Sequence, residues 1–235
     1  MWYFCEMGER IARRGYAPRI IRIFTMKVLY EDNHLIAVFK PAGVLVQGDE
    51  TGDVCLMDDV KKYLKEKYKK PGNVFLGLLH RLDRPVSGIV LFAKTSKGAA
   101  RLSEQIRNRT VQKVYQALVE GKFKNKSGTL VHYLWKDKEK NFVKVFDEPV
   151  DGALRAELDY EVADGNVVKI KLKTGRPHQI RAQFAHIGHP IVGDVKYGSK
   201  TKYREGEIAL CATEFGFETA TGGQRVVVSC KSCKL

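Results

Sequence analysis

"HRLDRPVSGIVLFAK" (His80–Lys94) joins a charged segment to an apolar one. The apolar half, Ile89–Lys94, predicts a buried β-strand, because it is a short run rich in β-branched and aromatic residues. In the charged half a lone carboxylate, Asp83, stands between Arg81 and Arg84. In an extended chain Arg81 and Asp83 point to the same face, where the arginine would stabilise the charged form of the acid. Composition alone favours a structural ion pair, whereas an acid held charged suits a nucleophile or a base rather than a general acid.

The residues around this stretch predict one α+β domain, with a mixed, largely antiparallel sheet flanked by helices. Helices are expected within Cys55–Lys70 and after Thr95 or Ser96, either of which can cap the helix that follows. Between the two motif halves, Pro85 and Gly88 allow a tight turn that would bring backbone close to a ligand. Period-two patterns and turn residues predict strands at Val28–Tyr30, Leu35–Phe39, Val74–Leu79, Lys113–Gly121 and Asn166–Lys173, and a C-terminal hairpin turning at Thr221–Gly223.

A second polar cluster, TGRPHQIRAQFAHIGHPIVGD, spans Thr174–Asp194. It predicts a helix with Pro177 near its first turn and Gly188 at its end. Its buried stripe would be formed by Ile180, Phe184 and Ile187. At the edge of that stripe His178 and Arg181 would project together.

The same cluster offers two imidazoles, His186 and His189, as candidate metal ligands. We expect no metal there, because the helix ends between them and no cysteine or acidic residue has ligand spacing. The alternative for the cluster as a whole is a plain polar helix face.

The charge balance points to a polyanionic partner. The chain has 235 residues, of which 44% are hydrophobic, and its 41 Lys and Arg against 27 Asp and Glu give a net charge of +14. A domain this basic indicates nucleic acid as the partner, against the alternative of a basic surface that only favours solubility.

The cysteines and the N-terminus bear on the compartment. The five cysteines are scattered and include a single C-x-x-C, Cys230–Cys233, so we expect reduced thiols and a reducing compartment. No apolar run approaches the ~20 residues of a membrane span, and residues 1–25 lack a signal-peptide pattern. A cytoplasmic location is therefore expected. Residues 1–25 would be an extension, or lie upstream of a start at Met26, and 26–235 would form the domain.

Three stretches together resemble the RluA family of RNA pseudouridine synthases. They are LYEDNHLIAVFKPAGVLVQGD, HRLDRPVSGIVLFAK and LKTGRPHQIRAQFAHIGHPIVGDVKYG, with KVYQALVEG as a shorter fourth. Their order agrees with the family, and they span Leu29–Gly198. The pairing of H-R-L-D-R and S-G with a downstream G-R-x-H-Q-I-R is the specific part of the resemblance. Domain 26–235 would then be a pseudouridine synthase catalytic domain.

The resemblance implies roles for individual residues. Asp83 matches the catalytic aspartate, Tyr115 the tyrosine that lies against the target base and is favoured as the base for its final proton, and Arg181 the arginine that pairs with the aspartate. The resemblance also implies RNA (rRNA or tRNA) as the partner, with no cofactor, no metal and no membrane, and we expect a monomer. The expected RNA-binding residues are Lys40, Arg81, Arg84, Arg176 and His178.

The chain departs from the family pattern in three places. Val86 stands where the family usually has threonine, and Cys211 stands where many members have histidine. We expect no S4 RNA-binding domain of the kind that many relatives carry, since residues 1–25 are too few to form it. RNA would then be held by the catalytic domain itself.

The implied reaction explains the lone carboxylate. Conversion of uridine to pseudouridine moves the base from an N1 to a C5 link on C1′, and needs no ATP. One carboxylate suffices, either by attacking C1′ or by taking the C2′ proton, whereas an ordinary glycosidase needs two. The remaining alternatives are a non-catalytic RNA-binding module on the same fold and a hydrolase that releases the free base.

Overall fold

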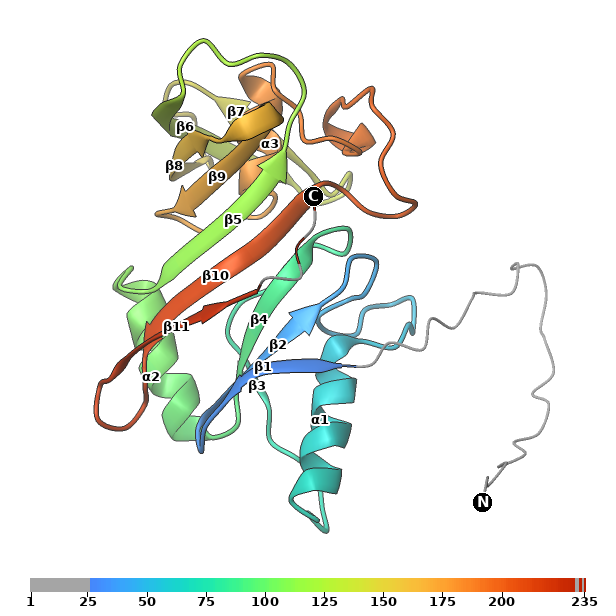
Figure 1. The fold of residues 1–235 in the computed structure, drawn as a ribbon, viewed down its shortest axis with the longest axis vertical. Coiled ribbons are helices and arrows are strands. Elements are labelled where there is room, and N and C mark those ends of the chain that lie inside the picture. Colours follow the sequence, from blue (N-terminus) through green and yellow to red (C-terminus); the bar gives the residue numbers. More distant parts are fainter. Residues whose placement is uncertain (1–25, 231–232, 234) are drawn as a thin grey trace, which may run out of the picture.

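The computed structural model describes residues 26–230, 233 and 235, so the expected extension at 1–25 lies outside the described residues (Figure 1). Its helices are α1 Leu56–Lys67, α2 Ser96–Arg107 and α3 Gln179–His186. The strands are β1 Lys27–Glu31, β2 Leu35–Lys40, β3 Gly77–Leu78, β4 Ser87–Ala93, β5 Gln112–Leu118, β6 Ser127–Asp137, β7 Phe142–Phe146, β8 Leu154–Val162, β9 Val167–Leu172, β10 Leu210–Glu218 and β11 Arg225–Ser229.

The strands of the described region form one mixed sheet of eleven strands. The main order is β1-β2-β4-β10-β5-β9-β8-β6-β7, with β3 beside β4 and β11 beside β10. Every neighbouring pair is antiparallel except β4 and β10, which run parallel through two residue pairs. The predicted α+β fold with a mixed, largely antiparallel sheet is confirmed.

Local side-chain chemistry sets the first hairpin and the start of α2. One carboxylate oxygen of Asp32 accepts hydrogen bonds from the backbone N–H groups of His34 (2.7 Å) and Leu35 (2.6 Å), which turns the chain between β1 and β2. The hydroxyl of Thr95 accepts from the N–H of Gly98 at 3.1 Å and so caps α2. No helix in the described part of the chain is both long and apolar enough to cross a membrane.

Both faces of the β2–β4 pair are buried, which explains the continuous apolar run after the charged motif. Val38 and Phe92 belong to the core cluster that contains Leu56, Val60 and Leu64 of α1. Their neighbours Ala37 and Leu91 belong instead to a cluster with Leu102 of α2 and Phe215 of β10. A strand buried on both sides needs apolar residues at every position rather than every second one.

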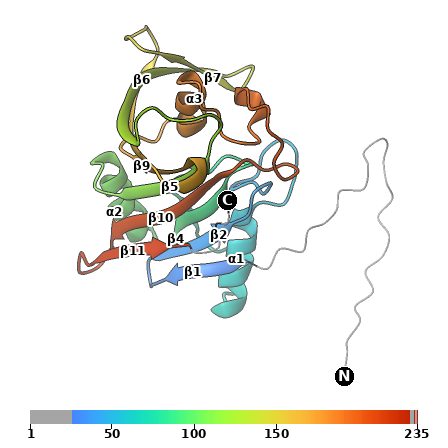
Figure 2. The same cartoon turned by 45° about the horizontal axis from the view of Figure 1, so that its top comes forward.

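The other half of the sheet wraps around α3. Figure 2 shows β6, β7 and β9 curving around this helix, and Ala182 of α3 packs with Leu134 of β6 and Val143 of β7. Strands β6, β7 and β8 were not among the predicted elements.

Pro177 lies two residues before α3, near its first turn as predicted, and the N-cap between them is His178, held in the left-handed region at φ 49°. One sequence prediction about local backbone was wrong in detail. The strand predicted at Val74–Leu79 shortens to Gly77–Leu78, the only residues there that pair with β4.

Gly88 makes the parallel contact between β4 and β10 possible. It lies opposite Ala212 at φ +126°, and a Cβ atom built there would be 2.4 Å from both the N and the O of Ala212. The close approach that the sequence suggested is therefore to the protein's own backbone, and not to a ligand. Only glycine fits this conformation and this spacing.

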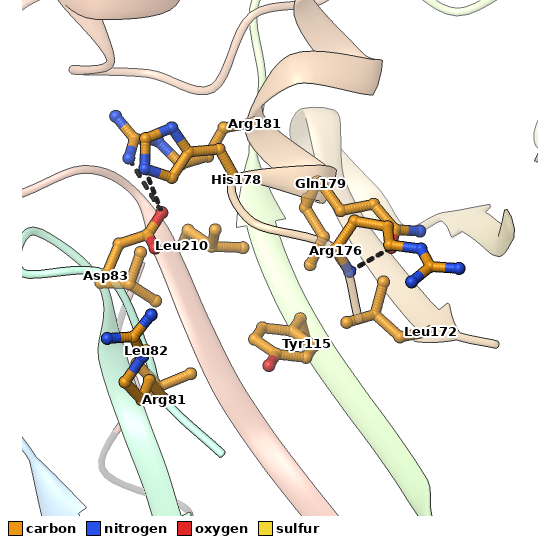
Figure 3. A pocket seen from close by; sticks show the side chains of 12 residues that line it. Arg81, Leu82, Asp83, Tyr115, Leu172, Arg176, His178, Gln179, Arg181 and Leu210 are labelled. Carbon is orange, nitrogen blue, oxygen red and sulfur yellow. Dashed lines mark hydrogen bonds and ion pairs between the residues drawn. The ribbon is translucent and has the colours of Figure 1, made fainter. Parts of the chain in front are cut away.

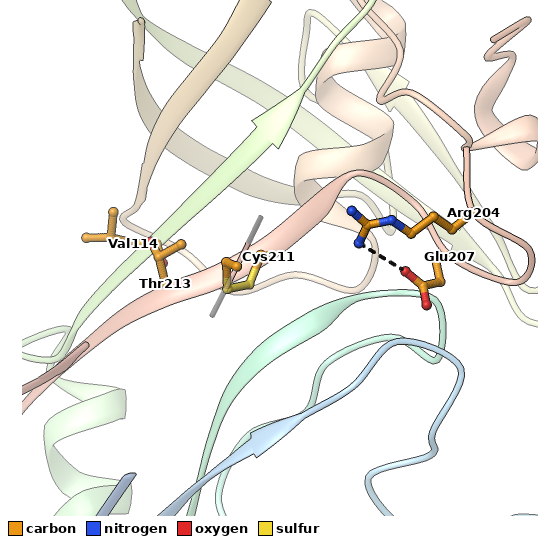
Figure 4. Close-up of a disulfide and its surroundings, with 6 residues drawn as sticks. Val114, Arg204, Glu207, Cys211 and Thr213 are labelled. Carbon is orange, nitrogen blue, oxygen red and sulfur yellow. Dashed lines mark hydrogen bonds and ion pairs between the residues drawn. A yellow bond between two sulfur atoms is a disulfide. The ribbon is translucent and has the colours of Figure 1, made fainter. Parts of the chain in front are cut away.

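The described cysteines correct the expectation of wholly reduced thiols. Cys211 of β10 is bonded to Cys233, which lies beyond β11, with a Cα–Cα distance of 6.1 Å (Figure 4). That distance lies in the range that a disulfide can bridge. The tail reaches β10 because the N–H of Cys230 donates to the carbonyl of Thr213 at 2.8 Å. Cys55 and Cys230 are buried free thiols.

Gly88→Ala should destabilise the fold severely, by roughly 3 kcal/mol or more, because the new methyl group meets backbone and the left-handed region is strained. Urea unfolding of both proteins would measure this difference. Gly72→Ala is the matched control, since its Cβ meets nothing within 4 Å and should change stability by less than about 0.5 kcal/mol. Equal urea midpoints for the two variants would contradict this account of the contact between β4 and β10.

Candidate active site

A cavity lies where the Arg81–Asp83 segment meets β5, β10 and the N-terminal end of α3 (Figure 3). About 380 Å³ of empty space lies between these residues, part of it open to solvent. Charged side chains line one side of the cavity and its rim. The apolar walls are Leu82, Val86, Tyr115, Leu172, Ile180 and Leu210.

Arg181 links Asp83 to a second, buried carboxylate. Its Nη1 donates to Asp83 Oδ2 at 2.9 Å, while its Nε and Nη2 donate to Asp194 at 2.7 and 2.9 Å. The side chain of Asp83 is 29% exposed, against 6% for Arg181 and 1% for Asp194. Burial alone would lower the pKa of Arg181, but its hydrogen bonds and the charges of both acids raise it. The guanidinium is therefore a permanent cation at the edge of the cavity.

His178 forms the other side of the Asp83 carboxylate. Its Nε2 lies 3.9 Å from Asp83 Oδ2, and its Nδ1 lies 2.8 Å from the hydroxyl of Tyr197. That hydroxyl already accepts the N–H of Val143 at 3.0 Å, so its own proton is available for Nδ1. Burial lowers the pKa of His178, against the opposing charge of Asp83. The lowered pKa favours the neutral imidazole, and in the tautomer whose Nδ1 accepts from Tyr197 the ring proton is on Nε2, the nitrogen nearer to the carboxylate.

Tyr115 of β5 lines the cavity opposite this charged group (Figure 3). Its side chain is almost fully buried. Burial, and then the negative charge of Asp83, raise the pKa of Tyr115 well above its usual range. The resting site therefore presents an aromatic ring with a protonated hydroxyl.

A wider groove runs outward from the cavity. It shares Arg81, Asp83 and Arg176 with the cavity, and it adds Lys136 of β6 and Lys196 of the short 3-10 turn Val195–Tyr197 after α3. Arg81, Lys136 and Lys196 are exposed, and Arg176 is half-buried. This positively charged floor suits a polyanion that continues beyond the group in the cavity.

The turn before α3 places Arg176. The side-chain oxygen of Gln179 accepts from the hydroxyl of Thr174 at 2.8 Å and from the backbone N–H of Arg176 at 2.9 Å. The guanidinium Nε of Arg176 donates to the carbonyl of Arg155 at 3.1 Å. The rest of that guanidinium lies at the cavity rim.

Lys40 does not occupy the position expected for a phosphate contact. It is fully buried, and its ammonium donates to the carbonyls of Pro41 (2.9 Å), Val44 (2.8 Å) and Arg84 (3.1 Å). Burial lowers its pKa to about 7, while the charge of Asp83 acts in the opposite direction. Lys40 thus ties the loop after β2 to the residue that follows Asp83.

The arginines that flank Asp83 in sequence are not its ion-pair partners. Arg84 pairs with Asp53 at 2.8 Å and donates to the carbonyl of Gly43 at 3.1 Å. Arg81 lines the cavity and the groove, and no ion pair of Arg81 is found among the described residues. The cation that holds Asp83 is Arg181, 98 residues away in sequence.

A sequence model described as RNA pseudouridylate synthase matches residues 34–186. The chain belongs to the RNA pseudouridylate synthase family. The RluA-type resemblance drawn from the sequence is thereby confirmed.

Bacterial members of the family align with most of the chain. The ribosomal large subunit pseudouridine synthase C of Buchnera aphidicola subsp. Schizaphis graminum is 30% identical over 234 residues, which cover 94% of this chain and 71% of that protein. The enzyme of the same name from Haemophilus influenzae is 33% identical over 81% of this chain and 60% of its own length. The RNA pseudouridine synthase YhcT of Bacillus subtilis, named as uncharacterized, is 32% identical over 75% and 59%. The chain thus spans about three fifths of these last two relatives.

Two human structures share the fold. The human RNA pseudouridylate synthase domain containing 4 superposes with a TM-score of 0.72 at 21% identity, covering 87% of this chain and 88% of that one. The human domain containing 1 superposes with a TM-score of 0.69 at 23% identity, covering 90% and 85%.

Two residues of the site were not predicted from the sequence. Asp194 and Tyr197 lie in the third quoted motif, but neither was given a role. The available signal was physical: a buried arginine requires a buried carboxylate, and Gly193-Asp194 offered the nearest one downstream.

Asp194→Asn should cost about 3–5 kcal/mol of stability, because it leaves a buried guanidinium with only the half-exposed Asp83 as its partner. Denaturant unfolding would measure this loss. The control is Asp159→Asn, which removes an exposed pair with Lys173 (2.8 Å) and should cost less than about 1 kcal/mol. A loss at Asp194 no larger than at Asp159 would contradict the structural role of the buried pair.

Proposed function

We propose that this chain isomerises uridine to pseudouridine in structured RNA, with ribosomal RNA as the first candidate and transfer RNA as the alternative. The observation that carries the proposal is the carboxylate of Asp83. It is anchored by Arg181 and faces a cavity whose apolar wall includes Tyr115, where we place the target base. Family membership supports the same reaction class, an intramolecular transferase.

The cavity requires the target nucleotide to leave its stack. The cavity lies between apolar walls that include Leu82, Leu172 and Leu210, and we infer that only an unpaired base enters it. Extrusion of a nucleotide costs a few kcal/mol, and least for loops and mismatches. Structured RNA with an unpaired uridine is therefore the substrate class that this site favours.

Asp83 has one carboxylate oxygen available for the sugar. Oδ2 accepts from Arg181, whereas no hydrogen bond to Oδ1 is found within the described residues. Oδ1 can attack C1′ as the N1 link breaks, or take the C2′ proton as the base leaves. In both routes the freed uracil turns within the cavity and rejoins through C5, and no second carboxylate of the ordinary glycosidase kind is required.

Tyr115 supplies the surface on which the base lies. Its hydroxyl is protonated at rest, because burial and then the charge of Asp83 raise its pKa. Rejoining through C5 displaces the ester, or returns the C2′ proton from Asp83, so the carboxylate is charged again in both routes when the C5 proton leaves. To accept that proton, Tyr115 would first have to give up its own.

The partner and location follow from the same proposal. The groove with Arg81, Arg176, Lys136 and Lys196 would hold phosphates on either side of the extruded uridine. We infer that the chain acts as a monomer, and in the cytoplasm, where ribosomal and transfer RNA reside. The Cys211–Cys233 bridge is the one observation that weighs against a reducing compartment.

Asp83→Asn should abolish pseudouridine formation, with a rate loss on the order of 10⁴-fold or more, as for other lost nucleophiles. The amide keeps the size of the side chain, and Arg181 keeps its bidentate partner Asp194, so folding should survive. Tritium release from C5-labelled uridine RNA and thermal melting would be measured on one preparation. A well-folded variant with near-normal release would remove Asp83 from the reaction, and the proposed function with it.

RNA affinity should fall steeply with salt. Each phosphate neutralised by the groove contributes about −0.7 to −0.9 to the slope of log K against log salt concentration. Filter binding of an unmodified RNA across a salt series would give this slope. Lys136→Gln should make it less negative by about one contact, whereas a slope near zero for the unmodified protein would exclude the groove as the RNA site.

A further inference from the structure

Two imidazoles and one carboxylate converge at the end of α3 opposite to His178. His132 comes from β6, Asp147 directly follows β7, and His186 is the last residue of α3. Asp147 Oδ1 lies 2.9 Å from Nε2 of His186 and 3.7 Å from Nε2 of His132, and the three ligand atoms all lie within 4.8 Å of one another. The cluster is outside the cavity that contains Asp83.

The ring of His132 is oriented by a buried amide. The side-chain nitrogen of Gln183 lies 2.9 Å from Nδ1 of His132, and Gln183 is fully buried. This contact occupies Nδ1 and leaves Nε2 facing Asp147. Imidazoles that bind metals have this arrangement, with the second ring nitrogen held by a protein group behind them.

One atom of that amide remains unpaired. In the described part of the chain, Gln183 Oε1 is the only buried side-chain N or O atom without a hydrogen-bond partner. A half-turn of the amide would make this oxygen the acceptor of Nδ1–H, which leaves a lone pair on Nε2 of His132. The alternative explanation, a surface ion pair, accounts for His186 and Asp147. It does not account for a second, buried imidazole aimed at the same oxygen.

The donor set and its spacing fit a transition-metal dication. Tetrahedral zinc with bonds of about 2.0–2.1 Å holds its ligand atoms roughly 3.4 Å apart. The present spacings lie on both sides of that value. Small movements would equalise them, since the side chains of Asp147 and His186 are 75% and 31% exposed.

We propose that His132, Asp147 and His186 form a zinc site, with water as the fourth ligand. The ion would join β6, the segment after β7 and the end of α3, and so fix the helix that carries Arg181. It has a stabilising role and takes no part in the reaction at Asp83. The pair considered from the sequence is a different one, because His189 bonds to the carbonyl of Glu120 at 2.9 Å and stacks on Phe123.

The test uses the full chain without a polyhistidine tag, stripped with EDTA and dialysed. Zn²⁺ is titrated by calorimetry, Co²⁺ is added as a spectroscopic probe, and melting temperatures are recorded with and without Zn²⁺. The variants are Asp147→Asn and His186→Gln. Asp151→Asn, at another exposed acid in the same segment, is the matched control.

The unmodified protein and Asp151→Asn should bind one equivalent of Zn²⁺ and melt at a higher temperature with it. Asp147→Asn and His186→Gln should lose roughly tenfold or more in affinity and show little rise in melting temperature, although all four proteins should melt alike in EDTA. Co²⁺ should give a tetrahedral visible spectrum without a thiolate charge-transfer band. Binding that is absent, that survives both ligand variants, or that shows the thiolate band of a cysteine site would overturn the proposal.

Discussion

The rest of the site depends on the hydrogen-bonded ion pairs that the guanidinium of Arg181 makes with Asp194 and Asp83. A buried cation is stable only when its charge is balanced and its donors are used. Asp194 supplies two of those hydrogen bonds from a position that is 1% exposed, and Asp83 supplies the third from the edge of the cavity. Arg181 therefore completes a buried structural pair with Asp194 and also holds the carboxylate of Asp83 in place.

This arrangement requires two parts of the sheet to meet. Asp83 precedes β4, whereas Arg181 lies on α3 within the curve of β6, β7 and β9. Between the two parts β4 and β10 pair only at Ser87–Cys211 and Gly88–Ala212. Because only these two residue pairs join β4 to β10, the two strands can diverge beyond them, and the cavity opens at that point. Gly88 is therefore a condition for the site as well as for the fold.

Local patterns predicted the elements well, because they rest on local physics. The Thr95 cap and the buried strand β4 each follow from neighbouring residues. Strands β6 and β8 escaped prediction, since exposed apolar residues such as Trp135 and Leu154 blur their alternation. Lys40 illustrates the limit for the site: only the tertiary structure shows that its ammonium is enclosed by three carbonyls.

The side chains of Lys40 and Arg181 both interact with the charge of Asp83. A change of that charge during the proposed reaction therefore affects both of them. Arg181 bonds to the carboxylate directly, and the buried ammonium of Lys40 interacts with its charge. If Asp83 forms an ester with C1′, both cations lose a compensating charge at that moment. In the proposed complex the phosphates of the RNA would lie in the groove that includes Arg81 and Arg176, where they would restore part of the balance. A free nucleoside brings no phosphate, so the positive charge around Asp83 favours a polynucleotide as the substrate of the proposed reaction.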